Sequence, residues 1–214
     1  MATGAIALQR MFQGAKETNL ENDELFPGST LPLGRGWLTV MAGLFSPPDE
    51  WGLEPDTGDW RNAGSIVIKL TYGGRKVLFC GDAVGRNDRE GLEPAIATER
   101  RMLDFAEVVS LKSDVIIAPH HGSDDASSRE FIAAVDPSWV VFSSGHAHHH
   151  PRQTTADRYL DHGIPAERML RTDRGDNEGG TEWSYATSPY PDPVGDDDVD
   201  ILIRPNGELL VEYR

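Results

Sequence analysis

The sequence predicts a single α/β domain, and three observations carry this prediction. The chain has 214 residues, of which 38% are hydrophobic and 26% charged, as in an ordinary soluble protein with one sizeable core. Two β-rich runs, residues 65–72 and 75–82, flank Gly73 and Gly74 and therefore predict a hairpin. Beyond this hairpin, strand-like apolar runs alternate with segments of helical spacing, which favours a sheet covered by helices.

The individual elements follow from local signals. Weak periodicity over residues 1–36 predicts an irregular lead-in with one short helix, and the turn-rich residues 46–64 predict a long connection. Three segments have helical spacing: Glu93 to Val109, Ser127 or Ser128 to Val135, and residues 151–163. Further strands are expected at residues 37–45, 114–119, 139–145 and 168–173. Residues 174–214 predict an acidic loop followed by a hairpin that turns at Asn206-Gly207.

Charge and composition exclude several classes of protein. The formal net charge of −15 disfavours a non-specific nucleic-acid surface, because such surfaces bind phosphates through Lys and Arg. No run of 18 apolar residues and no secretory signal is present, so we expect a cytoplasmic protein without a membrane span. Cys80 is the only cysteine, which excludes an intramolecular disulfide, and its apolar neighbours predict a buried thiol.

Polar side chains follow three predicted strands at the point where each strand ends. They are Asp82, the pair His120-His121, and the cluster His146 to His150. Because such strand ends gather at one edge of an α/β sheet, we expect the three segments to converge. Imidazole is the commonest metal ligand and a carboxylate is its usual companion, so this edge is a candidate metal site.

Each of these residues also has a simpler structural explanation. The segment His146 to His149 can be a solvated loop that only picks up stray metal, and Asp82 can be a turn residue after Gly81. His120 and His121 can be one packed and one exposed histidine, and His162 fits the C-terminus of a helix.

The quoted motifs resemble a known family. "NAGSIVIKLTYGGRKVLFCGDA", "DVIIAPHHGSDDASS", "WVVFSSG" and "HHHPRQ" resemble the C-terminal half of metallo-β-lactamase-fold hydrolases, and they are closest to the soluble domain of ComEC-type competence proteins. The resemblance covers about residues 36–173. It implies an αββα sandwich, of which this chain supplies mainly the C-terminal β-sheet and helical layer, within a single domain of residues 1–214.

The resemblance also implies a site and a chemistry. Asp82 resembles a bridging aspartate, His121 a metal ligand and His120 its neighbour or substitute, with zinc as the expected divalent metal and manganese as the second choice. Ser123, Ser144 and His150 resemble residues that bind substrate, with His150 as the proton donor. Asp82, His121 and His150 are therefore the expected catalytic residues of a metal-dependent hydrolase with a phosphodiester substrate. A serine hydrolase built on Ser123 is disfavoured, since Gly-x-Ser-x-Gly is absent.

One part of the family pattern is missing from the chain. The N-terminal His-x-His-x-Asp-His cluster has no counterpart, because no histidine precedes position 120. We expect a truncated reading of a longer gene, a separate N-terminal-half polypeptide as partner, or a homo-oligomer, since a lone half would expose an apolar sheet face. On its own the chain should be weakly active or inactive. The alternative is a non-catalytic remnant or a metal-dependent binding or assembly subunit.

Overall fold

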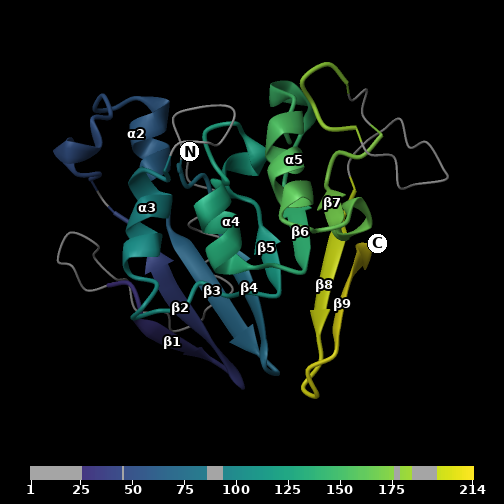
Figure 1. Cartoon of the computed structure of the whole chain (residues 1–214). Helices are drawn as coiled ribbons and strands as arrows, with labels where there is room; N and C mark the ends of the chain where they lie inside the picture. The colour runs from purple at the N-terminus through teal and green to yellow at the C-terminus, as the bar shows by residue number, and fades with distance from the viewer. Residues whose placement is uncertain (1–25, 45, 86–93, 176–178, 185–196) are drawn as a thin grey trace.

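A seven-stranded mixed sheet forms the centre of the molecule (Figure 1). The structure is a computed structural model, and it describes residues 26–214 except 45, 86–93, 176–178 and 185–196. The strands lie side by side in chain order, so that each strand pairs with the next along the sequence. They are β1 (Thr30–Leu33), β2 (Gly36–Ala42), β3 (Val67–Tyr72), β4 (Arg75–Phe79), β5 (Val115–Ile117), β6 (Trp139–Phe142) and β7 (Met169–Arg171).

The strand pairing in the sheet changes from antiparallel to parallel at β4. Strands β1 to β4 are antiparallel, and β3 and β4 form the predicted hairpin around Gly73 and Gly74. Strands β4 to β7 are parallel, and one helix connects each successive pair. The parallel strands therefore end at one common edge, the upper edge in Figure 1. The helices are α2 (Gly58–Ala63), α3 (Ala97–Asp104), α4 (Arg129–Val135) and α5 (Gln153–Asp161), with short 3₁₀ turns at Asp49–Trp51, Pro119–Gly122, His146–His148 and Ala166–Arg168.

The main core lies between the sheet and helices α3, α4 and α5. Met102 of α3, Phe131 of α4 and Tyr159 of α5 are fully buried and pack with Leu78 and Ile116 of the sheet. Their large apolar surfaces leave water on folding, which is the main stabilising contribution in a domain of this size. Cys80 belongs to this core and is 0% exposed, so the prediction of a buried thiol is confirmed, and burial raises the pKa of this thiol well above the usual value.

The opposite face of the sheet is covered over only part of its width. The hairpin of β8 (Val199–Ile203) and β9 (Leu209–Tyr213) packs Val211 against Val77, Val115 and Val141. Toward the β1 edge, no element in the described part of the chain buries this face, where Leu31 is 47% and Phe79 42% exposed. The sequence-based expectation of an incompletely covered apolar sheet face therefore agrees with this structure.

Three local predictions were wrong. β1 forms inside the predicted irregular lead-in, because residues 30–33 pair with residues 36–39 around a tight turn. Helix α2 lies inside the predicted loop 46–64, since the Thr57 hydroxyl accepts from the backbone N–H of Trp60 and caps it. Helix α3 begins at Ala97 rather than Glu93, because the N–H groups of Ile96 and Glu99 bind carbonyls of the preceding loop at Gly85 and Val84.

α3 also ends earlier than predicted. It stops at Asp104, and residues 105–109 continue as tighter turns in which the N–H of Val108 binds the carbonyl of Phe105. The predicted lead-in helix lies in residues 1–25, and much of the predicted acidic loop lies in 176–178 and 185–196. These stretches fall outside the described residues. No helix in the described part of the chain is long and apolar enough to cross a membrane.

Candidate active site

The candidate site is built on a tight turn after β5. His120, His121 and Gly122 have φ values of +47°, +57° and +85°, so three consecutive residues are left-handed. Two non-glycine residues in this region cost about 1–3 kcal/mol each, and such strain persists only where surrounding contacts enforce it. The N–H of His120 binds the carbonyl of Gly81 at 2.9 Å, and the N–H of Ser123 binds the carbonyl of His120 at 2.8 Å. The turn directs the imidazole of His121 toward Asp82 in the loop after β4.

Gly122 makes this turn possible. A Cβ atom at this position would lie 2.5 Å from Cβ of Pro151 and 2.8 Å from Cδ1 of Phe142. The carbonyl of Gly122 accepts from the N–H of Arg152 at 2.9 Å, which ties the turn to the segment that carries His150. The loops after β5 and β6 are therefore packed directly on each other.

His121 bridges the loops after β4 and β6. Its Nε2 lies 3.1 Å from Oδ1 of Asp82, and its Nδ1 lies 2.5 Å from the backbone carbonyl oxygen of Ser143. The hydrogen bond to Asp82 raises the pKa of His121, and the same hydrogen bond lowers the pKa of Asp82. Asp82 is positioned by its own N–H, which donates to the hydroxyl of Ser65 at 3.2 Å.

His120 is held between two other side chains. Its Nδ1 lies 2.8 Å from Oδ1 of Asp125, and its Nε2 lies 3.2 Å from Nδ2 of Asn62 at the end of α2. Burial opposes the charged form of His120, but the hydrogen bond and the charge of Asp125 raise its pKa above the usual value. With the proton held on Nδ1 by Asp125, Nε2 accepts from the Asn62 amide.

His150 lies beside the imidazoles of His120 and His121, and its ring centroid is also 6.0 Å from that of His148. Its ring centroid lies 6.0 Å from that of His120 and 6.4 Å from that of His121, and it is nearly parallel to the ring of His121. Burial, followed by the charge of Arg152, lowers the pKa of His150 to about 4, so this imidazole is neutral at pH 7. The expected convergence of the three strand ends is thus present in the structure.

The side chains of the two serines expected at the site both have protein partners. The Ser144 hydroxyl donates to Oδ1 of Asp173 at 2.6 Å, so it is directed toward the end of β7. The Ser123 side chain binds Asp125, and its carbonyl accepts from the hydroxyl of Thr155 at 2.9 Å. Both serines therefore stabilise the observed conformation of their loops. His149 lies 3.3 Å from Oε2 of Glu182.

A buried arginine supports the loop that carries His150. Arg171 of β7 is 1% exposed, donates to Asp173 at 2.8 Å and also pairs with Glu182. Its Nη2 donates to the carbonyl oxygen of His150 at 3.3 Å. Two carboxylates compensate the buried guanidinium, which leaves its remaining donors for the backbone.

Four side chains with a role at this edge were not assigned one from the sequence: Asn62, Ser65, Asp125 and Arg171. Asn62 and Ser65 belong to the Asn-x-x-Ser motif that precedes β3. The motif was visible in the sequence, but the sequence did not show which side chains these two residues contact. Asp125 lies five residues after His120 in the same loop. Arg171 had no signal, because a buried charge cannot be distinguished from an exposed one by residue type.

The donor atoms suit a divalent cation in part. In both His120 and His121, Nδ1 faces an oxygen acceptor, as is usual for metal-ligating histidines; Nε2 of His121 then faces Asp82, whereas Nε2 of His120 meets the Asn62 amide. Asp82 and His121 offer two donors side by side. Among the described residues, no group of three His, Cys, Asp or Glu side chains is placed to hold a metal ion. The described residues therefore fit two ligands of a cation and leave its shell incomplete.

Comparison with known proteins relates the chain to competence proteins. No protein-family model matches it. It is 34% identical over 114 residues to "Competence protein ComA" of Neisseria gonorrhoeae, covering 52% of this chain and 14% of that protein. It is 26% identical over 168 residues to "ComE operon protein 3" of Bacillus subtilis (strain 168), covering 78% of this chain and 18% of that protein. The chain thus spans less than a fifth of the length of either relative.

A distant likeness is found among solved structures. The "CmlA beta-hydroxylase E377D mutant" covers 69% of this chain with a TM-score of 0.40 and 16% sequence identity, and the match takes in 32% of that chain. A likeness of this size does not decide the fold. The observed architecture is a mixed α/β fold with one large sheet, and the sequence is similar to segments of two competence proteins.

Proposed function

We propose that this chain supplies part of the site of a competence-related, metal-dependent hydrolase that cleaves phosphodiesters. The observation that carries the proposal is the convergence of Asp82, His120, His121 and His150 from three strand ends, with both Nδ1 atoms of the pair His120-His121 already engaged. The similarity to competence proteins supports the assignment to that group.

The roles follow from the contacts. Asp82 and His121 hold a divalent cation, zinc or manganese, through Oδ1 and Nε2, while the Ser143 carbonyl and Asp125 orient the two rings. When bound, such a cation polarises a phosphodiester oxygen and stabilises the charge that develops on it. His150 is neutral at pH 7 and positions a substrate oxygen by hydrogen bonding, a role that suits its lowered pKa better than proton donation.

The incomplete shell and the open sheet face support a partner. The partner is a polypeptide that covers the apolar face near Leu31 and Phe79 and supplies the missing donors. A second copy of this chain offers only the same two-donor set again, so we favour a different polypeptide segment. The non-catalytic alternative, a metal-dependent assembly module, rests on the same absence of a third donor among the described residues.

Calorimetric titration of the full chain with zinc, at pH 7 and with particle mass measured by light scattering, tests the proposal. We expect Asp82→Asn and His121→Ala each to weaken zinc binding about tenfold or more, as mutation of metal-site residues usually does. His149→Ala is the control, since His149 pairs with Glu182, and it should bind zinc like the unmodified chain.

Two results would decide against the proposal. Equal zinc affinity in all three variants would remove Asp82 and His121 from the ligand set. Binding that depends on both residues, with no cleavage of bis(4-nitrophenyl) phosphate under any condition, including mixtures with a covering polypeptide, would favour the assembly module over the hydrolase.

A further inference from the structure

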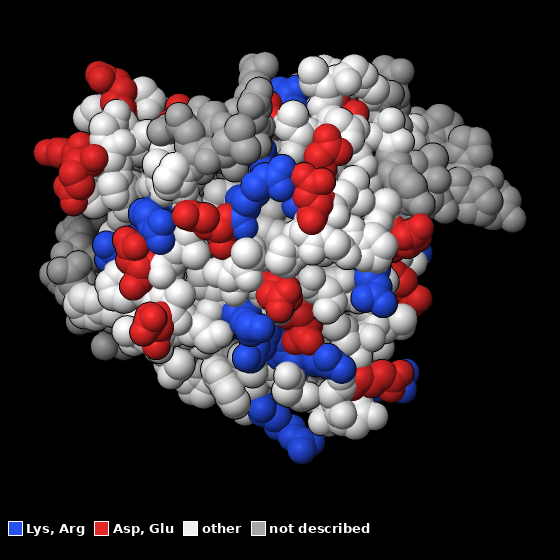
Figure 2. Space-filling model, in the orientation of Figure 1, with Lys and Arg blue, Asp and Glu red and all other residues white. Residues whose placement is uncertain are grey.

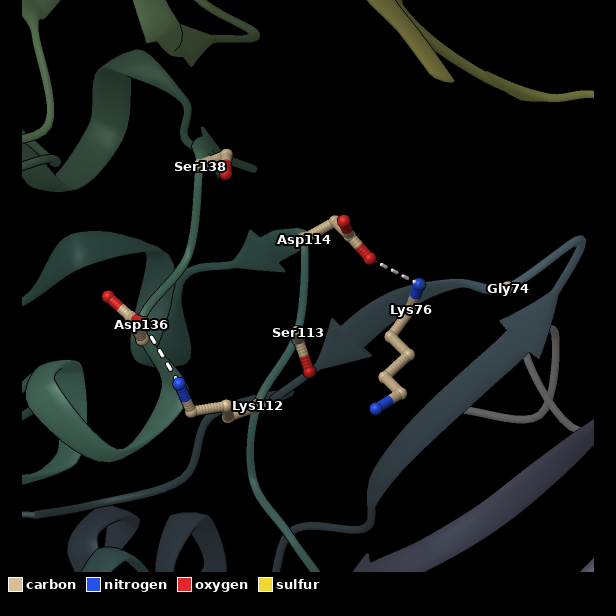
Figure 3. Close-up of a pocket in the computed structure, with 7 residues that line it drawn as sticks. All are labelled: Gly74, Lys76, Lys112, Ser113, Asp114, Asp136 and Ser138. Carbon is tan, nitrogen blue, oxygen red and sulfur yellow. Dashed lines mark hydrogen bonds and ion pairs between the residues drawn. The ribbon is translucent and has the colours of Figure 1, made fainter. Parts of the chain in front are cut away.

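A second polar cavity lies at the opposite end of the parallel strands. It has a volume of about 280 Å³ and is lined by residues from the β3–β4 turn, from the segment before β5 and from the segment before β6. Figure 3 shows Lys76, Lys112 and Ser113 around this hollow, with Ser138 and Asp114 at its border. Since the histidines follow the carboxyl ends of β4, β5 and β6, this cavity is separate from the candidate active site.

Lysines are concentrated at this cavity. The chain contains only four lysines, and two of them, Lys76 and Lys112, line the cavity. A third, Lys69, is buried next to it and donates to the carbonyl of Ser110. Burial lowers the pKa of Lys69 to about 8, and the positive charge of Lys76 adds to this lowering because the two ammonium groups repel each other. Figure 2 shows Lys and Arg side chains grouped on this lower part of the surface, in a chain of net charge −15.

The two carboxylates of the cavity are already engaged. Asp114 accepts from Nη1 of Arg75 and from the backbone N–H of Lys76, both at 2.8 Å. Asp136 lies 3.2 Å from Nζ of Lys112 and 3.3 Å from Nε2 of His162. Lys76, in contrast, has no ion pair with any described residue. Three lysines lie in this region, and among the described residues that line the cavity only the two carboxylates just named are there to balance them. The local balance of charge therefore favours an additional anion.

A hydroxyl group adds a short-range donor. Ser113 and Ser138 both line the cavity, one before β5 and one before β6, but the Ser113 hydroxyl already donates to the carbonyl of Leu111 at 3.0 Å, so Ser138 is the donor available to an anion. A tetrahedral oxyanion accepts several hydrogen bonds at once, and lysine binds phosphate as a mobile point charge. The volume of the cavity, about 280 Å³, has room for one phosphate group.

We infer that the cavity at Lys76, Lys112, Ser113 and Ser138 is a binding site for a phosphate group. The bound anion neutralises the unpaired ammonium of Lys76 and relieves its repulsion with Lys69. The ligand is either free inorganic phosphate or the terminal phosphate of an ester such as a nucleotide. This inference does not depend on the proposed hydrolase, because none of its residues belongs to the histidine site.

Titration with inorganic phosphate, followed by amide NMR of the full chain at constant ionic strength in chloride, tests the inference. We expect saturable shifts centred on Gly74, Ser113 and Ser138. Lys76→Gln should weaken binding about tenfold, as expected for the loss of one charge-assisted hydrogen bond. Arg129→Gln is the control for net charge, because Arg129 pairs with Asp161 on the helical surface, and it should bind phosphate like the unmodified chain.

The outcomes distinguish free phosphate from a phosphate ester, and both from a failure of the proposal. Equal affinity for phosphate and a nucleoside 5′-monophosphate identifies the free ion, and tighter binding of the monophosphate identifies a terminal ester; both support the site. Shifts centred on His120 to Gly122, shifts that never saturate, or equal weakening by Lys76→Gln and Arg129→Gln would overturn it. Melting temperatures of both variants confirm that they are folded.

Discussion

Nε2 of His121 lies 3.1 Å from Oδ1 of Asp82 while the opposite ring nitrogen lies 2.5 Å from a backbone carbonyl oxygen. Both partners of this imidazole are hydrogen-bond acceptors, since a carbonyl and an ionised carboxylate have no proton to give. A neutral imidazole has only one N–H and satisfies only one of them. The arrangement is therefore balanced either by an imidazolium with two N–H groups or by a cation between Nε2 and Asp82.

The contact between Asp125 and His120 predicts a change in the tautomer of His120. In Asp125→Ala, Nδ1 loses its acceptor and the proton is no longer held there, so the two neutral tautomers should become mixed. We also expect a loss of about 1–2 kcal/mol of stability, because a hydrogen bond to a charged group is removed. ¹⁵N NMR of the imidazole nitrogens at a pH where His120 is neutral reports the tautomer.

Asp124→Ala is the matched control in the same loop, because the Asp124 carboxylate binds the Thr154 hydroxyl instead of His120. It should leave the His120 spectrum unchanged. An Asp125→Ala spectrum with the proton still fixed on Nδ1 would show that Asp125 does not orient this ring.

Gly122 should tolerate no side chain. In Gly122→Ala, the new Cβ meets Pro151 at 2.5 Å and Phe142 at 2.8 Å, and φ at +85° adds strain. We expect a destabilisation of about 2–4 kcal/mol, since overpacking and a left-handed alanine act together. Denaturant unfolding measures the difference.

Gly145 offers the comparison at the same edge of the sheet. It has φ −153°, and nothing lies within 4 Å of an added Cβ, so Gly145→Ala should change the stability by no more than about 0.5 kcal/mol. Equal effects at positions 122 and 145 would contradict the close packing of the loops after β5 and β6.

Glu99 predicts a particular dependence of stability on pH. Its carboxylate is 0% exposed, accepts from the N–H groups of Ser127 and Ser128 at 2.6 and 2.9 Å, and burial raises its pKa to about 7. Between pH 4.5 and 7 the folded protein holds a proton that the unfolded chain has lost. This contribution is complete below pH 4.5 and is lost as the pH rises through 7.

Glu99→Gln removes this titration. The free energy of unfolding of the unmodified chain, relative to that of the variant, should fall by about 2–3 kcal/mol from pH 4.5 to 7.5. Urea unfolding at several pH values gives both curves. The variant is expected to be less stable in absolute terms, because glutamine offers one acceptor oxygen to two N–H groups, so the slope is the deciding quantity. Parallel curves would exclude a raised pKa at Glu99.

Substitutions at two adjacent residues of β4 should have different effects, one on stability and one on association. Leu78 is 0% exposed and packs under the helices, so Leu78→Ala should cost about 2–5 kcal/mol. Phe79 points to the other face and is 42% exposed, so Phe79→Ser should change stability by less than 1 kcal/mol but reduce association through the open sheet face. Unfolding and light scattering measure the two effects. A loss of stability in Phe79→Ser as large as that in Leu78→Ala would mean that this face is covered within the chain.

The sequence allowed the strand ends to be predicted better than the side-chain geometry. Within the predicted runs 75–82 and 139–145, residues 75–79 and 139–142 form strands, because apolar β-rich runs followed by polar loops are strong local signals, although both strands end three residues earlier than predicted. Their convergence followed from the parallel pairing of β4, β5 and β6. The orientation of His120 and His121 could not be predicted, because two successive left-handed histidines are fixed by tertiary contacts with Gly81 and Ser143.

Other differences have similar physical causes. Asn62 lies on a helix of six residues within a stretch rich in Pro, Gly and Asp, where periodicity is too short to be recognised and a single Thr57 cap decides the structure. Ser144 had been expected at the substrate, and it binds Asp173 instead because β7 ends beside β6. Local sequence patterns predicted where strands form. Which side chains come into contact depends on how the strands pair in the sheet.

The parallel strands β4, β5 and β6 also set a length scale. Ser113 and Pro119 lie at opposite ends of the β5 segment, six residues apart, and an extended chain advances at most about 3.3 Å per residue, which gives about 20 Å. One phosphate group is too small to reach both the lysine cavity and the imidazoles. A polymer that contacted both would have to run along the outside of the sheet for this distance, so the shortest oligonucleotide that gains affinity from both ends would report the length of β5.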